Sequence, residues 1–211
     1  MITKKKFFIF DFDGVMCDST GCAYQAHNLI AKKYGLNMIF SSDDFLNIID
    51  NHNLSKNILD EDIMNYYDDF NAIYEKKLSK IKIFKNAKKF LLSKKNIVII
   101  TSNYEKIVRQ ILIDNEIDND VIVIGKETGT NKSNRLNLYI KKNNLKRDEI
   151  VYIGDTYDDY LFCTKEKIKM IGVNFGYSNL EKIKNKLMKL FFTDESLYEY
   201  IVEDMSSNDN N

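Results

Sequence analysis

The sequence predicts an α/β protein with a doubly wound parallel sheet, into which a small all-helical domain is inserted. Three features of its 211 residues support this prediction. An apolar run at Phe7–Phe10 has the length and bulk of a strand buried on both faces. A block of about 60 residues after Ser19 shows only helical periodicity. From Asn86 onward helical and strand patterns alternate, which is typical of a parallel sheet with crossover helices.

The helical block begins shortly after the first strand. One helical face carries Ala23, Ala26, His27, Ile30 and Ala31, and Gly35 stands where a helix would end. The polar segments 41–44 and 60–62 are typical of helix starts, and each precedes a further helical pattern.

The remaining elements follow in alternation. The expected helices cover residues 87–93, 104–114, 136–143 and 157–165, and the expected strands cover residues 96–100, 120–124, 150–153 and 170–173. The polar end, residues 206–211, is expected to be frayed. We therefore assign residues 1–17 and 82–211 to the α/β core and residues 18–81 to the inserted helical domain, which we call the cap.

Charge and composition exclude several classes of partner. Lys+Arg and Asp+Glu both count 31, so no net positive charge favours a nucleic acid or an anionic membrane. The apolar runs are far shorter than the roughly 20 residues that span a bilayer, and no signal peptide precedes the first strand. Cys17, Cys22 and Cys163 lack metal-ligand spacing and leave an odd thiol, which fits a reducing compartment, and Cys17 is interpreted as a packing residue. We expect a cytoplasmic protein, monomer or homodimer, that acts on a small molecule.

The most informative segment is Asp11-Phe12-Asp13-Gly14, which directly follows the first strand. In open α/β sheets, ligands collect beyond the carboxyl ends of the strands. Two carboxylates this close repel each other unless a cation, a donor or a shared proton compensates. A simple turn is the alternative, because Asp and Gly are common turn residues.

Three later segments add polar groups at predicted strand ends. Segment 101–103 offers hydroxyls and free backbone N–H groups for an anion, although a helix N-cap explains it as well. The loop 125–135 carries Lys126 and Lys132, which either reach the strand ends or lie on the surface. Segment 154–159 is a second carboxylate cluster, or else a turn with an acidic helix start. Together they predict a site for a phosphate group with Mg²⁺.

These motifs also resemble those of a known family. Asp11-Phe12-Asp13-Gly14-Val15, Thr101, Lys132 and Gly154-Asp155-Thr156-Tyr157-Asp158-Asp159 match, in order and strand-end placement, the four motifs of the haloacid dehalogenase-like hydrolases. The resemblance covers residues 7 to about 177 and implies a Rossmann-like core, to which residues 84–91 would return from a helical cap. Ser133 stands where the family often has a proline, so Lys126 is an alternative to Lys132.

The resemblance implies a catalytic role for each motif. Asp11 is the expected nucleophile, which forms an aspartyl-phosphate, and Asp13 is the expected general acid and base. Thr101, with Ser102 and Asn103, is expected to bind the phosphoryl group. Lys132 is expected to bind it too and to offset its charge and that of Asp11.

Mg²⁺ is the cofactor that the resemblance implies. Asp11, Asp155 and the backbone carbonyl of Asp13 are its expected ligands. Asp159 would bind through water or steady Lys132, with Asp158 as the alternative acidic residue. Family members that displace chloride use no metal and generally lack Asp at the position of Asp13, so Asp13 favours phosphoryl transfer.

We therefore predict a Mg²⁺-dependent phosphatase that hydrolyses a small phosphorylated metabolite, with the cap as a lid that excludes water and selects the leaving group. A phosphomutase of the same family is an alternative. A receiver-like phosphate-binding regulator is another, although receivers are shorter and carry the phosphorylated Asp on a later strand. Sugar phosphates, phosphoglycolate and nucleotide monophosphates all fit the motifs. His27, Tyr66, Tyr67 and Tyr74 could face the cleft, but they are explained more simply as packing residues of the cap.

Overall fold

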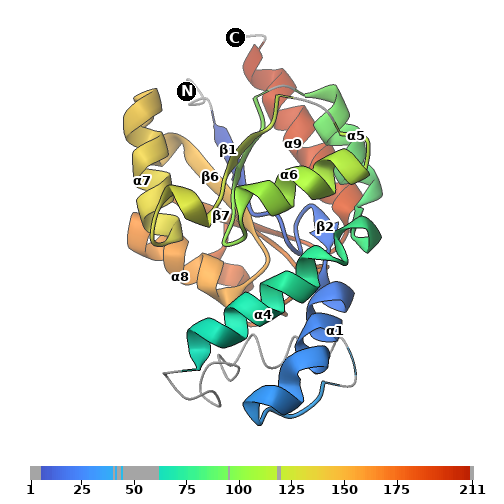
Figure 1. Ribbon diagram of the computed structural model, residues 1–211. Helices are drawn as coiled ribbons and strands as arrows, with labels where there is room; N and C mark the ends of the chain where they lie inside the picture. The colour runs from blue at the N-terminus through green and yellow to red at the C-terminus, as the bar shows by residue number, and fades with distance from the viewer. Residues whose placement is uncertain are drawn as a thin grey trace.

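The computed structural model describes residues 6–39, 41, 44, 62–94, 96–117 and 120–209. Within them, six parallel strands form one sheet: β1 (Phe7–Phe10), β4 (Val98–Ile100), β5 (Ile122–Ile124), β6 (Ile150–Gly154), β7 (Lys169–Val173) and β8 (Lys189–Phe191). Their order is β5-β4-β1-β6-β7-β8, so the sheet grows outward on both sides of β1 (Figure 1). The predicted doubly wound α/β fold is confirmed, and the strand order reverses at β1, where such folds bind their ligands.

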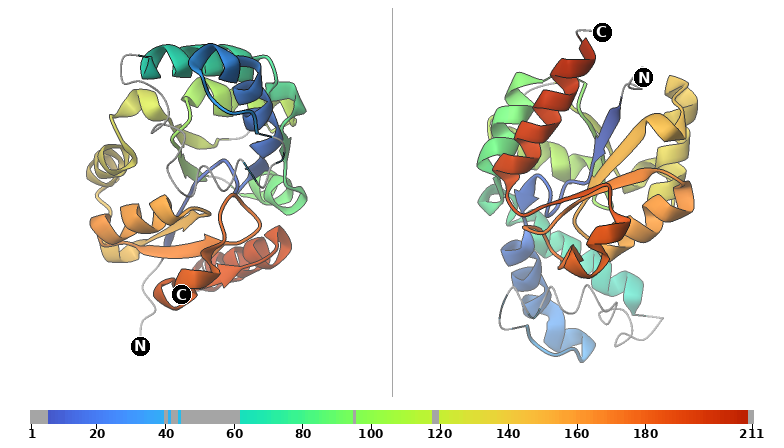
Figure 2. Two further views of the ribbon diagram at one scale, coloured as in Figure 1. Left: turned by 90° about the horizontal axis from the view of Figure 1, so that it is seen from below. Right: turned by 180° about the vertical axis from the view of Figure 1, so that it is seen from behind.

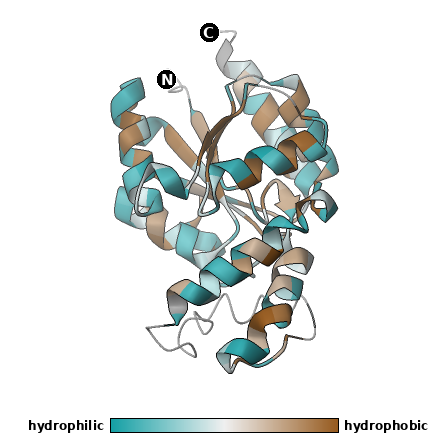
Figure 3. Cartoon of the chain, viewed as in Figure 1, coloured by the Kyte–Doolittle hydropathy of each residue, from teal (hydrophilic) through white to brown (hydrophobic). Residues whose placement is uncertain are grey.

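Helices cover both faces of the sheet. One face packs against α5 (Lys85–Ser93), α6 (Glu105–Asp114) and α9 (Asp194–Asp209), and the other against α7 (Lys132–Asn143) and α8 (Tyr157–Glu166) (Figure 2). Phe8 and Phe10 point to the first face and Ile9 to the second, so both sides of β1 are buried. This two-sided burial explains why the strand is an unbroken apolar run, and Figure 3 shows the hydrophobic strands between helices with hydrophilic outer faces.

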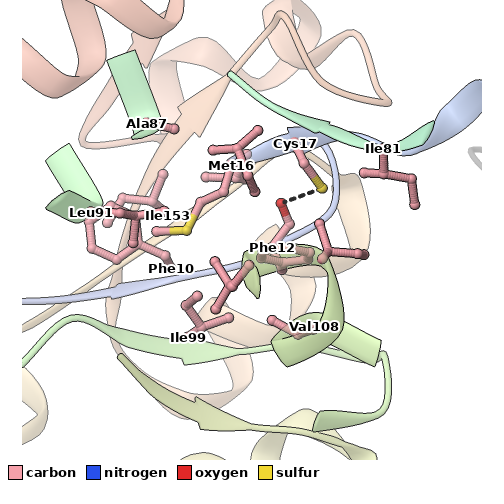
Figure 4. Close-up of a cluster of buried hydrophobic side chains, with 14 of the residues drawn as sticks. Phe10, Phe12, Met16, Cys17, Ile81, Ala87, Leu91, Ile99, Val108 and Ile153 are labelled. Atoms are coloured by element: carbon pink, nitrogen blue, oxygen red, sulfur yellow. Dashed lines mark hydrogen bonds between the residues drawn. The ribbon is translucent and has the colours of Figure 1, made fainter. Parts of the chain in front are cut away.

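The loop after β1 is anchored by its own apolar side chains. Phe12 and Met16 are fully buried and join Phe10 in the cluster that Figure 4 shows. Cys17 is also fully buried, and its thiol donates to the carbonyl oxygen of Phe12 over 3.8 Å. The interpretation of Cys17 as a packing residue is confirmed, and all three cysteines are buried and free.

Two helices of the inserted segment pack together beyond the carboxyl ends of the strands. They are α1 (Thr20–Ile30), continued by a 3-10 turn at Ala31–Tyr34, and α4 (Ile63–Glu75) (Figures 1 and 2). The helical patterns before Gly35 and after segment 60–62 are confirmed. The helix expected after segment 41–44 lies outside the described residues. None of the described helices has the length and apolar character needed to cross a membrane.

A short antiparallel ribbon connects these helices to the sheet. Its strands, β2 (Cys17–Asp18) and β3 (Lys82–Ile83), pair Cys17 with Ile83 and Asp18 with Lys82. The chain therefore leaves the α/β part and returns to it at one place. The sequence did not predict this ribbon, because a strand of two residues carries no periodic signal.

Helices α7 and α9 differ most from the prediction. Helix α7 begins at Lys132 rather than at Leu136, because the Asn131 side chain accepts a hydrogen bond from the backbone N–H of Asn134 and so caps an earlier start. Residues 206–209, predicted to be frayed, belong to α9, which Leu197 and Ile201 anchor in the core.

Candidate active site

Three predicted residues meet because their strands are neighbours. β1 pairs with β4 and β6, with Phe10 opposite Ile99 and Ile153. Asp11, Thr101 and Asp155 follow these strands directly and are all buried. Parallel pairing therefore brings residues from three distant parts of the chain to one edge of the sheet.

Lys132 joins two of the carboxylates. Its Nζ lies 2.7 Å from Asp11 Oδ2 and 2.7 Å from Asp159 Oδ1. Burial lowers the pKa of Lys132, but the charges of Asp11 and Asp159 more than offset this, so the pKa lies well above the ordinary lysine value. Lys126 has a different contact: its Nζ lies over the ring of Tyr104, 3.5 Å from the centroid. Of the two predicted alternatives, Lys132 is the one that contacts Asp11.

Asp159 and Asp158 differ in burial: Asp159 is buried, and Asp158 is exposed. Asp159 is the third residue of α8, and its Oδ2 accepts hydrogen bonds from the backbone N–H and the hydroxyl of Thr156, at 3.1 and 2.7 Å. This capping arrangement turns Asp159 toward Lys132, whereas Asp158 is exposed. The phase of the helix therefore selects Asp159 as the buried acidic residue.

Asp155 is fully buried, and its two oxygens differ in their contacts. Its Oδ2 accepts a hydrogen bond from the backbone N–H of Tyr177 over 2.6 Å, whereas its Oδ1 has no hydrogen-bond partner among the described residues. Burial, with the nearby charges of Asp159 and Asp11, raises the pKa of Asp155 well above its ordinary value. Gly14 lies directly against this carboxylate: it has φ of 76°, and a Cβ there would lie 2.0 Å from Asp155 Oδ2. Only glycine fits at this position.

Burial also changes the proton affinity of the nucleophile candidate. It raises the pKa of Asp11 to about 7, against the opposing effect of Lys132. Asp11 Oδ1 accepts a hydrogen bond from the backbone N–H of Phe12 over 2.8 Å, and Oδ2 accepts the one from Lys132. The carboxylate orientation is therefore fixed at both oxygens.

Asp13 is held by two residues that the motifs did not single out for this role. The Ser19 hydroxyl donates to Asp13 Oδ1 over 2.6 Å and also contacts the Tyr177 hydroxyl. The Asn103 amide contacts Asp13 Oδ2 at a longer 3.4 Å. Burial raises the pKa of Asp13, and the bond from Ser19 opposes that rise. Tyr177 follows β7, so the rule that ligands collect at strand ends could have pointed to it; Ser19 offered no such signal.

Thr101 and the two residues after it form a tight turn. Thr101 Oγ1 accepts a hydrogen bond from the backbone N–H of Asn103 over 3.1 Å, which leaves its own hydroxyl hydrogen free to donate. The Asn103 side-chain oxygen accepts from the backbone N–H of Tyr104 over 2.9 Å. The turn therefore presents one donor hydroxyl beside the carboxylates.

A cavity of about 400 Å³ opens over these groups. Its floor includes Asp11, Asp13, Thr101, Lys132 and Asp155, with Ser102, Asn103 and Asp159 also in the lining. Helix α4 contributes a second wall, made by Tyr67, Phe70, Asn71 and Tyr74. All eight predicted site residues therefore border one cavity.

The tyrosines of α4 differ in environment. Tyr66 is buried, and its hydroxyl lies 2.9 Å from His27 Nδ1, which confirms both as packing residues. Tyr67 is 42% exposed and lines the cavity together with the buried Tyr74. Tyr74 is thus a core residue, as expected, that also borders the cavity, whereas the exposed Tyr67 fits the alternative that it faces the cleft.

The residues present fit a hard divalent cation. Asp11, Asp155 and Asp159 each offer a carboxylate oxygen, and these oxygens lie within 4.8 Å of one another. Lys132 balances only part of the charge of three buried carboxylates, and Asp155 Oδ1 has no hydrogen-bond partner among the described residues. Carboxylate oxygens are the ligands that Mg²⁺ prefers in proteins. The unpartnered oxygen and the surplus of negative charge are what a bound cation would satisfy.

Comparisons with known proteins agree with this geometry. A family model described as haloacid dehalogenase-like hydrolase matches residues 8–173. A search of curated proteins gave no significant match. Among solved structures, a haloacid dehalogenase-like family hydrolase from Streptococcus pneumoniae is similar, with 17% identity, a TM-score of 0.79, and coverage of 95% of this chain and 100% of that chain.

Two further solved structures cover the same length. A predicted phosphatase from Clostridium acetobutylicum has 17% identity and a TM-score of 0.77. A predicted phosphoglycolate phosphatase from Haemophilus somnus has 18% identity and a TM-score of 0.76. Each match covers 95% of this chain and 100% of the other. At these identities the likeness concerns the fold.

Proposed function

The chain belongs to the haloacid dehalogenase-like hydrolases, and from that premise we propose that it is a Mg²⁺-dependent phosphatase. It would hydrolyse a small phosphomonoester through an aspartyl-phosphate on Asp11. The observation that carries the proposal is the position of Lys132, 2.7 Å from both Asp11 and Asp159, two carboxylates that each have an oxygen within 4.8 Å of one of Asp155. Such a site offers a nucleophile, one fixed positive charge and room for a metal ion.

In the first step an Asp11 carboxylate oxygen forms a bond to phosphorus, and the bond from phosphorus to the ester oxygen breaks. The electron pair of that bond stays on the ester oxygen, which takes a proton from Asp13. Lys132 and the free hydroxyl hydrogen of Thr101 stabilise the phosphoryl oxygens during the transfer. The products are the alcohol and the aspartyl-phosphate.

In the second step Asp13 acts in the opposite direction. Its carboxylate takes a proton from water as the water oxygen attacks phosphorus, and the acyl-phosphate bond to Asp11 breaks. This returns Asp11 as a carboxylate and releases inorganic phosphate. Splitting the displacement in two lets one residue serve as acid and then as base.

Asp11, Asp155 and the backbone carbonyl of Asp13 would hold the metal ion. When bound, Mg²⁺ would supply positive charge that favours the ionised form of Asp11 and neutralises phosphoryl oxygens. Both oxygens of Asp159 are engaged, by Lys132 and by Thr156, which supports its role in steadying Lys132. Asp159 therefore positions the lysine in this proposal.

We further propose that residues 18–81 act as the cap, that residues 1–17 and 82–211 form the catalytic core, and that the α4 wall of the cavity contacts the leaving group. Tyr67, Phe70 and Tyr74 face the carboxylates across the cavity, where they would exclude water. The buried free thiols support a reducing compartment such as the cytoplasm. The expected partner is a small phosphorylated metabolite.

The test is release of inorganic phosphate from p-nitrophenyl phosphate and a panel of small phosphomonoesters, with Mg²⁺ and with EDTA. Turnover should require Mg²⁺ and disappear in Asp11→Asn, whereas Asp114→Asn on the exposed side of α6 should behave as the native chain. Formation of a phosphate isomer without phosphate release would indicate a mutase instead. Turnover that persists in Asp11→Asn would contradict the covalent mechanism.

A further inference from the structure

Beyond the residues of the four motifs, Ser19 and Tyr177 form a second layer of contacts around Asp13. Ser19 precedes α1 at the border of the inserted segment, and Tyr177 lies in the loop after β7. They are 158 positions apart, yet their side-chain oxygens are in contact. Ser19 is 1% exposed, so it exchanges hydrogen bonds mainly with protein groups.

The direction of these hydrogen bonds follows from the donors available. Asp13 accepts, so the single hydroxyl hydrogen of Ser19 is used on Asp13 Oδ1. The contact between Ser19 and Tyr177 must then use the hydrogen of Tyr177. The result is a chain in which Tyr177 donates to Ser19 and Ser19 donates to Asp13.

The same loop holds the proposed metal ligand. The backbone N–H of Tyr177 donates to Asp155 Oδ2, and a Cβ on the preceding Gly176 would lie 2.5 Å from Asp155 Cβ. The loop therefore touches the metal side of the site with its backbone and the acid side with one hydroxyl. A substitution of the Tyr177 side chain can separate these two contacts.

We propose that Ser19 and Tyr177 are positioning residues for the general acid: they fix Asp13 Oδ1, so that Oδ2 is the oxygen that gives its proton to the leaving group. Oδ2 lies 3.4 Å from the Asn103 amide, a longer contact than that of Oδ1 with Ser19, and Asp13 lines the cavity. This inference rests on the proposed phosphatase function. It adds that proton transfer depends on two residues outside the four motifs.

The test uses the basicity of the leaving group. p-Nitrophenolate departs readily without a proton, whereas the more basic phenolate needs one, so a misplaced acid harms phenyl phosphate more than p-nitrophenyl phosphate. General acid catalysis contributes roughly 10²- to 10⁴-fold, so partial misplacement in Tyr177→Phe should lower kcat/KM for phenyl phosphate by about tenfold or more. The loss for p-nitrophenyl phosphate should be several times smaller. Ser19→Ala should also lose more kcat/KM for phenyl phosphate than for p-nitrophenyl phosphate. Asp13→Asn, which lacks the acid, should show the largest difference between the two substrates.

Two controls separate positioning from general loss of structure. Tyr139→Phe and Ser93→Ala make the same chemical changes away from the cavity and should leave both substrates unaffected. The Mg²⁺ concentration for half-maximal activity should stay unchanged in Tyr177→Phe, because the backbone bond to Asp155 remains. If Ser19→Ala does not fold, Tyr177→Phe carries the test alone.

The possible failures are distinguishable. Equal losses on the two substrates, or none, would overturn the positioning role while the phosphatase proposal stands. No turnover of either substrate by the native chain with Mg²⁺ would overturn the proposed function and this inference with it.

Discussion

Lys132 Nζ lies 2.7 Å from Asp11 Oδ2, although the two residues are 121 positions apart in the chain. The pair is largely buried, with 15% and 11% of the two side chains exposed. A buried carboxylate that loses its only cation becomes an unpaired charge, so this contact affects folding as well as chemistry.

Lys132→Met should therefore lower both stability and activity. Without Mg²⁺, Asp11 and Asp159 lose their cation, and the free energy of unfolding should fall by about 3–5 kcal/mol in urea denaturation. With Mg²⁺, kcat should fall by about 10²- to 10³-fold. Lys142→Met, exposed on the same helix, serves as the control. A near-native Lys132→Met combined with an inactive Lys126→Met would transfer the role to Lys126.

Gly14→Ala should displace Asp155, because the added Cβ would lie 2.0 Å from its Oδ2. The expected result is loss of Mg²⁺-dependent activity and a lower Tm. Gly35→Ala is a matched control: Gly35 also has a positive φ, of 63°, but no atom lies within 4 Å of its added Cβ. It should cost only the backbone strain, about 1–2 kcal/mol, and keep its activity. Equal effects of the two variants would show that backbone strain, not contact with Asp155, explains the loss.

Asp155→Asn should abolish the effect of Mg²⁺ on stability. In EDTA the variant should be more stable than the native chain, since an amide replaces a buried carboxylate with an unpartnered oxygen. Mg²⁺ at about 100 times its Kd should stabilise the native chain by ~2.7 kcal/mol and leave the variant unchanged. Thermal unfolding with EDTA and with Mg²⁺ measures both. A native Tm that does not respond to Mg²⁺ would argue against a metal at this site.

The metal-free protein should lose stability as pH rises. The pKa of Asp11 is raised from 3.8 to about 7, so the folded state binds a proton more tightly than the unfolded state. Its contribution is present in full below pH 4 and is lost as pH rises through about 7. Asp13 and Asp155 shift in the same direction, whereas Lys132 stays protonated across this range. Urea denaturation in EDTA at pH 5 and pH 8 should differ by ~3 kcal/mol, and by less in Asp11→Asn.

Tyr67→Ala should weaken substrate binding rather than chemistry. Tyr67 lines the cavity from α4 and takes no part in either proposed chemical step. KM should therefore rise by about tenfold, with a smaller change in kcat. Met64→Ala, exposed on the same helix outside the cavity lining, should keep the native KM. An unchanged KM in Tyr67→Ala would remove Tyr67 from the leaving-group wall.

Strand ends were the part of the site that could be predicted. Asp11, Thr101 and Asp155 each follow an apolar run, and parallel pairing then fixes their meeting place. The choice between Asp158 and Asp159 depends on which of them the first turn of α8 directs inward, and the sequence left that choice open. The contact between Ser19 and Tyr177 joins two irregular segments, and no periodic pattern encodes such a pair.

The prediction missed helix α9 (Asp194–Asp209), to whose residues it assigned only a frayed end, and it also missed three short strands. β8 has only three residues, Lys189–Phe191, at the edge of the sheet, and β2 and β3 have two each. In such strands the pairing partner supplies most of the stabilisation, so the local sequence carries little information.

The ribbon of β2 and β3 has a consequence for how new specificities can arise. The chain leaves the α/β part at β2 and returns to it at β3, and these two strands pair through Cys17 with Ile83 and Asp18 with Lys82. Loop-closure cost rises slowly with length, so the intervening segment can grow, shrink or be exchanged while those pairs and the sheet stay as they are. A foreign helical segment grafted between the same two pairs would bring a different wall to the same carboxylates. For the phosphatase proposed here, recombination at this junction would change the wall that contacts the leaving group and leave Asp11 and Asp155 in place.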